Sequence, residues 1–406
     1  MRPCSARGLR LDGLASARKH GLASARKHSL APSRALAICV LPIALSLVAC
    51  QEGGLDKSVA SEVKIAVDHH LARLGGAPSF GTFPVAPNAS WCDLQTLHFE
   101  DDGQYSTSSP GNSTSAKNPY FLGKNGELTL TDKVNRNVTL RYSGYYDLDG
   151  DAYWFLIRSS ISENLLFGVR QISGKPTVAD DWHIFGETLI FAKSTDAQVP
   201  ENIGRAFAGE AKIDGSGAIT SGVIKDSRDK SILLAGLMSG GTLGFTDFAI
   251  EFKGEDTRSF SGGIAKHVGV LVDKTWDDGE IGTLVMVRKQ TASADITRLI
   301  GTWRVGLHAI FNKPGRAGVA SSSGVLLLET GKTWSLSFTD SKTVLSGTFD
   351  VGDNGAFTLV ENGGFNQRFE GAVDPDYRTL TFVDKTVENS ADPFVALYFG
   401  IMEKKI

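Results

Sequence analysis

The 406-residue chain has few cysteines, few prolines and no excess of basic residues. Its formal net charge of −3 gives no electrostatic reason to expect a nucleic-acid partner. A composition of 41% hydrophobic and 21% charged residues excludes a disordered chain, a collagen, a coiled coil and a polytopic membrane protein. A chain of this length can bury one large core or two to three smaller ones.

The sequence also lacks the short motifs of common active sites. It has no Gly-x-Ser-x-Gly, no phosphate-binding loop and no His-Glu-x-x-His pattern. His69 and His70 adjoin each other, but neighbours on a helix point about 100° apart and make poor joint ligands. We therefore predict no catalytic residue and no cofactor.

The first 49 residues have the layout of a secretory signal peptide. Eight Lys and Arg side chains and a single acid, Asp12, precede an apolar stretch from Ala35 to Ala49. That stretch contains Pro42 and is too short to span a bilayer comfortably. The leader is predicted to be an export signal and not an anchor.

The leader ends in Leu47-Val48-Ala49-Cys50, followed by Gln51. This segment resembles the lipobox of bacterial lipoproteins at all four positions. The resemblance implies cleavage before Cys50, acyl chains on Cys50 and a membrane as partner through those chains. Two or more chains hold a protein stably on a membrane. Gln51 resembles the sorting pattern for the outer membrane, so the resemblance implies an exported protein anchored at the bacterial envelope.

The four cysteines fit this interpretation. Cys4 and Cys39 fall in the leader, and with Cys50 lipidated Cys92 has no partner within the chain. A disulfide scaffold and a zinc site built from cysteines are both excluded. Cys92 is predicted to be a small buried hydrophobic residue.

Apart from one short segment, the sequence predicts an all-β protein. Apolar residues between Lys57 and Leu74 have helical spacing, and Gly75-Gly76 follows as a stop, so a short N-terminal helix is expected there. Beyond it, short stretches rich in β-branched and aromatic residues alternate with Gly, Asp, Asn and Ser turns.

These stretches recur as three tandem antiparallel units of about 115 residues. Turn glycines stand at 103, 217 and 331, steps of 114 residues, and matching glycines stand at 126, 241 and 355 and at 144, 262 and 371. We divide the chain into a signal peptide (1–49), a lipidated tether with the short helix (50–76) and three β repeats (77–171, 172–290 and 291–406).

Each unit is expected to contain about eight strands, which can close in two ways. A half-period favours a six-bladed β-propeller, because residues 298–305 resemble residues 344–351 at an offset of 46. The alternative is three eight-stranded barrels. Gly301-Thr302-Trp303 resembles the Gly-x-Trp opening of lipocalin-like barrels, and that resemblance supports the alternative.

Asp147, Asp149 and Asp151 form the most metal-like cluster, because alternate aspartates can present oxygens to Ca²⁺. The segment lacks the glycine and the final acid of a calcium loop, and Arg158 stands at the acid's position. It aligns with the acidic turn at Asp374. We therefore favour a plain hairpin turn over a metal site.

Two kinds of function remain. The first is a non-catalytic envelope lipoprotein that binds a protein, a glycan or a small molecule. The second is an enzyme, a carbohydrate-active hydrolase or lyase that uses acids such as Asp180-Asp181 or Asp277-Asp278. A lipocalin-like carrier of a small apolar ligand is a further alternative. The sequence leaves the enzyme question open and favours the non-catalytic module.

Overall fold

In a computed structural model of the chain, all the residues that the structure describes lie within one compact unit, Cys50–Ile406. They are Val63, Ile65 and residues 68–76, 92–108, 115–135, 138–148, 152–158, 163–170, 178–190, 203–226, 231–240, 246–252, 257–273, 280–313, 316–363, 367–384 and 394–403.

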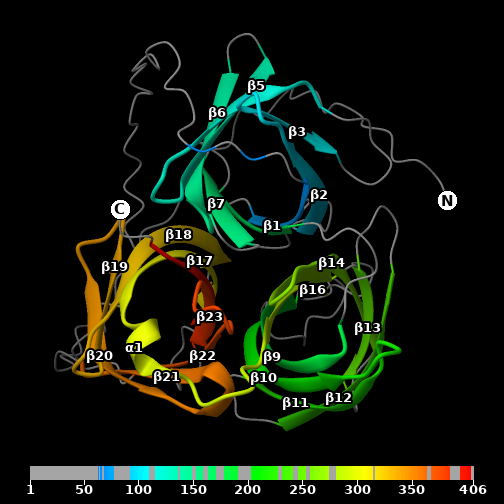
Figure 1. The fold of residues 1–406 in the computed structure, drawn as a ribbon, viewed down its shortest axis with the longest axis vertical. Coiled ribbons are helices and arrows are strands. Elements are labelled where there is room, and N and C mark those ends of the chain that lie inside the picture. Colours follow the sequence, from blue (N-terminus) through cyan, green and yellow to red (C-terminus); the bar gives the residue numbers. More distant parts are fainter. Residues whose placement is uncertain are drawn as a thin grey trace, which may run out of the picture. The chain divides into compact units, whose positions relative to one another are not determined.

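These residues form three closed antiparallel barrels of eight strands each (Figure 1). The first barrel contains β1 Asp68–Gly76, β2 Cys92–Phe99, β3 Gln104–Ser108, β4 Asn118–Leu122, β5 Glu127–Asn135, β6 Val138–Tyr146, β7 Ala152–Arg158 and β8 Glu163–Arg170. The second contains β9 Asp180–Ile190, β10 Ile203–Ile213, β11 Ile219–Asp226, β12 Ser231–Gly240, β13 Thr246–Phe252, β14 Thr257–Ile264, β15 Val268–Asp273 and β16 Glu280–Arg288. The third contains β17 Gly301–Lys313, β18 Arg316–Leu328, β19 Thr333–Phe338, β20 Val344–Val351, β21 Ala356–Glu361, β22 Arg368–Val373, β23 Thr379–Asp384 and β24 Phe394–Met402. The helix α1 Ile296–Leu299 precedes the third barrel, and the 3-10 turn η3 Asp353–Gly355 lies within it.

The propeller prediction is wrong, and the alternative of three eight-stranded barrels is confirmed. In each unit the first strand pairs with the last, β1 with β8, β9 with β16 and β17 with β24. Each unit therefore pairs its two edge strands with each other and does not need a neighbouring blade to cover them. The half-period that favoured a propeller relates β17 to β20, two strands of one barrel.

The N-terminal helix prediction is wrong where the structure describes it. Residues Asp68–Gly76 form strand β1, which pairs with β2 on one side and with β8 on the other. Hydrogen bonding along both edges closes the first barrel, and that gain outweighs the helical spacing of the apolar residues. Apart from Val63 and Ile65, the earlier part of the predicted helix lies outside the described residues.

The described landmark glycines of the first two sets are turn residues, as their recurrence predicts, whereas Gly144, Gly262 and Gly371 lie within strands β6, β14 and β22. Gly103, Gly126, Gly217 and Gly355 have φ values of 82°, 90°, 92° and 86°, in the left-handed region that glycine adopts without strain. In the third unit the residue with positive φ at the first landmark is Lys332, at 56°, one position after Gly331. At Gly126 a Cβ would also lie 2.6 Å from the carbonyl oxygen of Tyr146, so only glycine fits.

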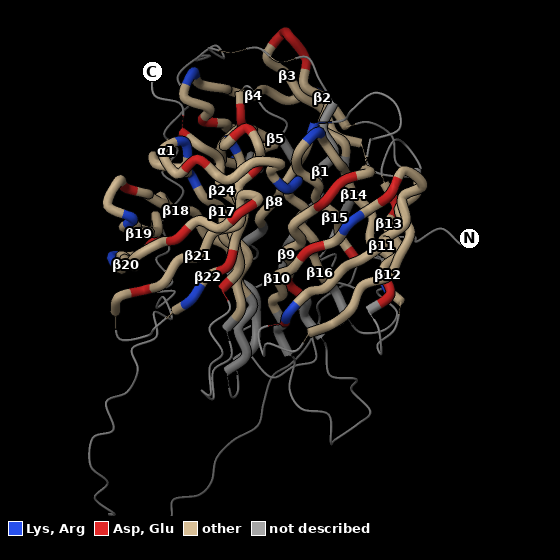
Figure 2. The backbone as a smooth tube through the Cα atoms, turned by 60° about the horizontal axis from the view of Figure 1, so that its bottom comes forward, with Lys and Arg blue, Asp and Glu red and all other residues tan. Residues whose placement is uncertain are grey.

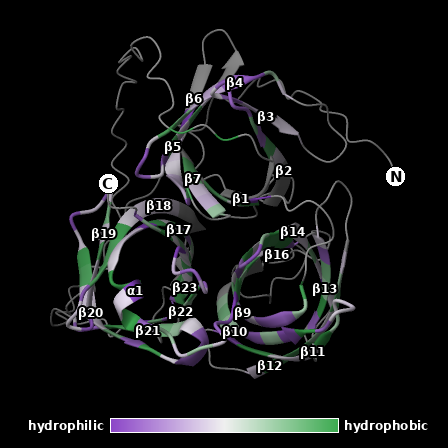
Figure 3. Cartoon of the chain, in the orientation of Figure 1, coloured by the Kyte–Doolittle hydropathy of each residue, from purple (hydrophilic) through white to green (hydrophobic). Residues whose placement is uncertain are grey.

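Aromatic side chains fill the interior of the third barrel. The ring of Phe382 stacks on Tyr398 with centroids 4.3 Å apart, and Phe369 packs edge-on against both. The ring of Trp334 also packs edge-on against Phe369, with centroids 5.7 Å apart. Figure 3 shows hydrophobic and hydrophilic residues alternating along strands of all three barrels, as expected for walls with one buried face.

A second core joins the barrels through the outer faces of their closing strands. One apolar cluster contains residues of all three barrels, among them Leu166, Val285 and Leu397. In β7 the Trp154 side chain faces outward, and its Nε1 donates to the carbonyl of Arg304 in β17 at 3.0 Å. No helix in the described part of the chain is long and apolar enough to cross a membrane.

Candidate binding site

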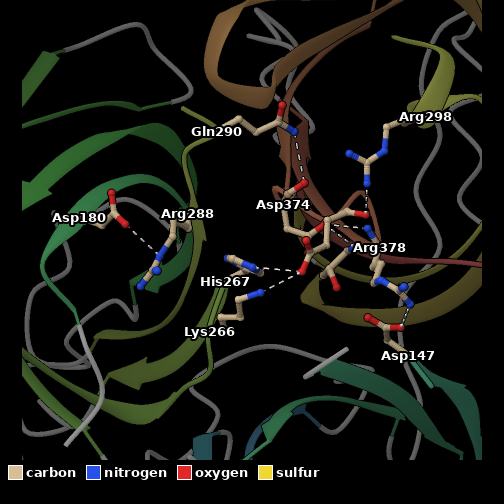
Figure 4. Close-up of polar contacts among 11 residues, drawn as sticks. Asp147, Asp180, Lys266, His267, Arg288, Gln290, Arg298, Asp374 and Arg378 are labelled. Atoms are coloured by element: carbon tan, nitrogen blue, oxygen red, sulfur yellow. Dashed lines mark hydrogen bonds and ion pairs between the residues drawn. The ribbon is translucent and has the colours of Figure 1, made fainter. Parts of the chain in front are cut away.

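Three equivalent hairpin turns, one from each barrel, meet in a network of polar contacts (Figure 4). They are the β6–β7 turn at Asp147, the β14–β15 turn at Lys266-His267 and the β22–β23 turn from Asp374 to Arg378. Each turn follows the landmark glycine of its unit, at 144, 262 or 371. We call this set of turns the turn junction.

The third-barrel turn is built around the buried carboxylate of Asp374. Its Oδ1 accepts hydrogen bonds from the backbone N–H groups of Arg378, at 2.7 Å, and Thr379, at 3.0 Å. Its backbone carbonyl accepts from Tyr377, which has a positive φ of 61°. Burial raises the pKa of Asp374 to about 7, since removal from water penalises the charged form.

The same turn contacts both other barrels. Asp376 Oδ2 lies 3.4 Å from Lys266 Nζ and 3.1 Å from His267 Nε2 of the second barrel. Arg378 Nη1 lies 3.5 Å from Asp147 Oδ1 of the first barrel. The β22–β23 turn therefore links all three barrels through ion pairs.

The linker before the third barrel completes the junction. Gln290 donates from Nε2 to the Asp374 carbonyl at 3.3 Å and accepts from the Tyr377 hydroxyl at 2.9 Å. Arg298, in α1, donates to the Asp376 carbonyl at 3.1 Å and lies over the Tyr377 ring at 4.3 Å. These contacts fix the guanidinium of Arg298 beside the turn.

A cavity of about 380 Å³ lies beside the turn junction, between the first and third barrels. The first barrel contributes Asn125, Tyr146, Asp147 and Leu148 to its lining. A volume in this range suits a small organic ligand. We call it the junction cavity.

The third barrel lines the opposite side with Arg298, Arg378, Asp376, Tyr377 and Met402. The lining therefore combines two guanidinium groups, two carboxylates, two phenol rings, an amide and two apolar side chains. Such a surface can bind a ligand by hydrogen bonds, charge and apolar contact. Among the described residues of the lining there is no Ser, Cys, Lys or His that could act as a nucleophile or a base.

Only one of the three proposed calcium ligands can be placed. Asp147 is 6% exposed, and its Oδ1 lies 3.5 Å from Arg378 Nη1. Asp149 and Asp151 lie outside the described residues. Within the part of the chain that the structure describes, no three His, Cys, Asp or Glu side chains group as metal ligands. The choice between a plain turn, which we favoured, and a calcium site therefore stays untested.

The other residues singled out from the sequence lie away from the cavity or cannot be placed. Cys50 lies outside the described residues, as do Asp277 and Asp278. Asp180 forms an ion pair with Arg288 at 3.3 Å, and Arg288 also lies over the ring of Trp182 at 5.1 Å. The carboxylate of Asp180 is thus occupied by a cation.

Sequence reasoning missed a buried polar cluster between the second and third barrels. His308 Nδ1 contacts Glu187 Oε1, and Thr283 and Ser321 stand directly opposite them on the neighbouring strands. All four residues are buried, and burial raises the pKa of Glu187. The two partners are 121 residues apart in the chain, so no local pattern could have joined them.

Comparisons with known proteins give no family. No family model and no curated protein matches the chain. Among solved structures, a mutant of Transferrin Binding Protein B from Haemophilus parasuis Hp5 is similar over 85% of this chain and 77% of that chain, at 10% identity and a TM-score of 0.29. The same protein from serogroup B Neisseria meningitidis covers 83% and 76%, at 8% identity and a TM-score of 0.29.

A protein of unknown function from Nostoc punctiforme, of the DUF3598 family, is similar over 84% of this chain and 96% of that chain. Its identity is 10% and its TM-score is 0.15. Scores this low carry no argument about the function of this chain, which has to come from its own residues.

Proposed function

We propose that the protein is a bacterial envelope lipoprotein, held on the outer membrane by acyl chains on Cys50, and that it acts as a non-catalytic binding module. The lipobox at 47–50 and the basic, apolar leader before it support the anchoring. The tether places the three barrels outside the cytosol, where they can meet a protein, a glycan or a small molecule.

The junction cavity is the proposed binding site. The observation that carries this is the meeting of polar side chains from the first and third barrels around about 380 Å³ of space. A ligand there would contact residues from turns that are far apart in the chain but held together by ion pairs. A site formed by such turns is fixed before the ligand arrives, which lowers the entropy cost of binding.

The alternative functions have less support. A hydrolase needs free acids, whereas Asp180 is paired with Arg288. A carrier of apolar ligands needs a cavity inside a barrel, and in the third barrel stacked rings such as Phe382 and Tyr398 occupy that space. The eight-stranded barrel fold alone is common to many functions.

Fatty-acid labelling in cells tests the anchor. We expect the full chain to incorporate an alkyne fatty acid and to fractionate with membranes, and Cys50→Ala to lose both properties. Cys92→Ala is the matched control and should keep both. Label that persists in Cys50→Ala would contradict the anchoring proposal.

Ligand-observed NMR on the detergent-solubilised full chain tests the site. Neutral and acidic mono- and disaccharides are screened, and every hit is repeated with Leu148→Trp, which fills the junction cavity. Val344→Trp is the control, because Val344 is 58% exposed on the wall of the third barrel. Hits should vanish in Leu148→Trp and persist in Val344→Trp. Hits that survive Leu148→Trp would place the binding site elsewhere.

A further inference from the structure

We infer that the ligand of the junction cavity carries an anionic group, a carboxylate or a phosphate, which binds the guanidinium of Arg298. This inference rests on the proposed function, because it assigns a ligand class to the same cavity. The inference depends on which charged side chains around the cavity already have a partner of opposite charge.

The two carboxylates of the lining are engaged by cations. Asp147 lies 3.5 Å from Arg378 Nη1. Asp376 lies within ion-pair distance of both Lys266 and His267. Neither acid is left to neutralise a further positive charge in the cavity.

Arg298 lacks such a partner among the described residues, since none of their carboxylates lies within 4.0 Å of its guanidinium. The nearest acid in sequence, Asp295, caps α1: hydrogen bonds from Thr297 lower its pKa, and the charge of Arg298, beyond ion-pair distance, adds to that shift. Asp295 Oδ1 accepts from the backbone N–H of Thr297 at 2.9 Å and from the Thr297 hydroxyl at 2.7 Å. The charge of Arg298 is therefore open to a ligand.

The guanidinium is also held in position. It donates one hydrogen bond to the Asp376 carbonyl and rests on the Tyr377 ring, which leaves most of its five N–H donors unused. A fixed, planar fork of donors matches the two oxygens of a carboxylate or a phosphate. Little side-chain entropy remains to be lost when such an anion binds.

The opposite side of the cavity suits the remainder of a small polar molecule. Asn125 uses Oδ1 to accept from the N–H of Glu127 at 3.1 Å, so its amide N–H groups can face a ligand hydroxyl. Leu148 and Met402 offer apolar contact. These features fit an anion with a sugar-sized, hydroxylated body, such as an acidic sugar or a sugar phosphate.

Pairs of charged and neutral ligands test the inference. The solubilised full chain is titrated with glucuronate against glucuronamide, and with glucose 6-phosphate against glucose. We expect at least one charged probe to bind about tenfold more tightly than its neutral twin, the size of a good charge-assisted contact. The pair that shows the preference identifies carboxylate or phosphate as the group.

Variants assign the preference to Arg298. Arg298→Gln should remove it, and Arg298→Lys should keep part of it, because the charge remains without the planar fork. Arg170→Gln is the control, since Arg170 is exposed on β8 of the first barrel and does not line the cavity. The preference of Arg170→Gln for the charged probe over its neutral twin should equal that of the wild type.

The outcomes separate the anion inference from the proposed site. If charged and neutral twins bind equally, and both lose binding in Leu148→Trp, the anion inference is wrong and the cavity remains the proposed binding site. A preference for the charged twin that survives Arg298→Gln also overturns it. If binding survives Leu148→Trp, both the proposed binding site and the anion inference are wrong. If none of the probes binds, the anion inference is wrong.

Discussion

Strands on two sides of the same barrel differ in how they are buried. In the third barrel, β23 is buried at all six positions, whereas β20 alternates between exposed and buried residues. In the second barrel β15 is likewise buried throughout. Because both of its faces are covered, β15 carries a near-continuous apolar run, whereas β23 also buries the polar residues Thr379, Thr381 and Asp384.

This difference shows that the three barrels pack against one another and are not independent domains. Tyr398 packs inside the third barrel, while the next residue, Phe399, contacts Phe167 of the first barrel at 5.0 Å. The closing strands therefore belong to two cores at once. Acidic and basic residues are interspersed over the barrels in Figure 2, and one apolar cluster contains residues of all three barrels.

Truncation of an outward-facing residue on a closing strand should have the largest effect. Phe399→Ala removes a fully buried ring from between two barrels and should lower the free energy of unfolding by about 4 kcal/mol. Val344→Ala removes an exposed side chain from β20 and should change it by less than about 0.5 kcal/mol. Urea denaturation followed by tryptophan fluorescence measures both. Similar costs for the two variants would show that the outer face of β24 is not a core surface.

The second comparison is between a buried and an exposed ion pair. His308→Ala leaves Glu187 buried without its partner and should cost about 3 kcal/mol, the lower end for a broken buried pair. The lower end is expected because Glu187, whose pKa burial raises, can stay protonated. Lys332→Ala breaks a pair with Asp350 in which both side chains are more than half exposed, and should cost less than about 1 kcal/mol.

The same denaturation experiment checks this pair of variants. The ranking of the two costs is the informative quantity, because each variant removes one partner from one acidic side chain. If His308→Ala cost no more than Lys332→Ala, the contact between the second and third barrels would be open to water in solution.

Much of each barrel was predictable from the sequence, because turn chemistry is local. Gly126 and Gly217 have the positive φ that their recurrence predicts. The closure was not predictable, because pairing of β17 with β24 joins residues about 90 positions apart. The first strand was misassigned for the same reason, since its partners β2 and β8 decide its conformation.

The candidate site was predictable only in part. The alignment of Asp147 with Asp374 identified equivalent acidic turns and favoured a turn over a metal site. It could not show that the two turns come together, nor that Arg378 would pair with Asp147. Trp182 was also missed as the counterpart of Trp303. Each indole donates to a carbonyl four residues earlier, at 2.9 Å and 3.0 Å.

The pH dependence of stability offers a comparison between a buried acidic turn, at Asp374, and an exposed one. Burial raises the pKa of Asp374 from 3.8 to about 7, so its folded form holds a proton that the unfolded chain releases. Its contribution to stability is therefore complete below about pH 4 and is lost as the pH rises toward 7. The slope should reach about 1.4 kcal/mol per pH unit at its steepest. Asp374→Asn keeps an oxygen acceptor for the two backbone N–H groups and should remove this slope.

The exposed turn at Asp214 should respond in the opposite sense. A hydrogen bond from the Ser216 hydroxyl, with others from the backbone, lowers the pKa of Asp214. Its contribution is present above the unfolded pKa and is lost as the pH falls. Denaturation between pH 3 and pH 8 should thus show Asp214→Asn and Asp374→Asn changing the profile with opposite signs. A wild-type slope that Asp374→Asn leaves unchanged would assign the titration to another group.

The smallest effect should come from adding one methyl group to a contact between barrels. In Gly306→Ala the new Cβ would lie 2.8 Å from Leu165 Cδ1 and 3.0 Å from the Trp154 ring, both on the first barrel. The Leu165 methyl ends a flexible side chain and can shift, whereas the buried Trp154 ring is held by its hydrogen bond to Arg304, so we expect a cost of about 1 kcal/mol. In the control Gly331→Ala, the nearest atom to the new Cβ is 3.9 Å away, in the exposed turn before β19. Because both variants remove a glycine, they share the effect on the unfolded chain, and the difference in their urea midpoints isolates the packing between barrels. Equal midpoints would mean that the first and third barrels are not in contact at Gly306 in solution.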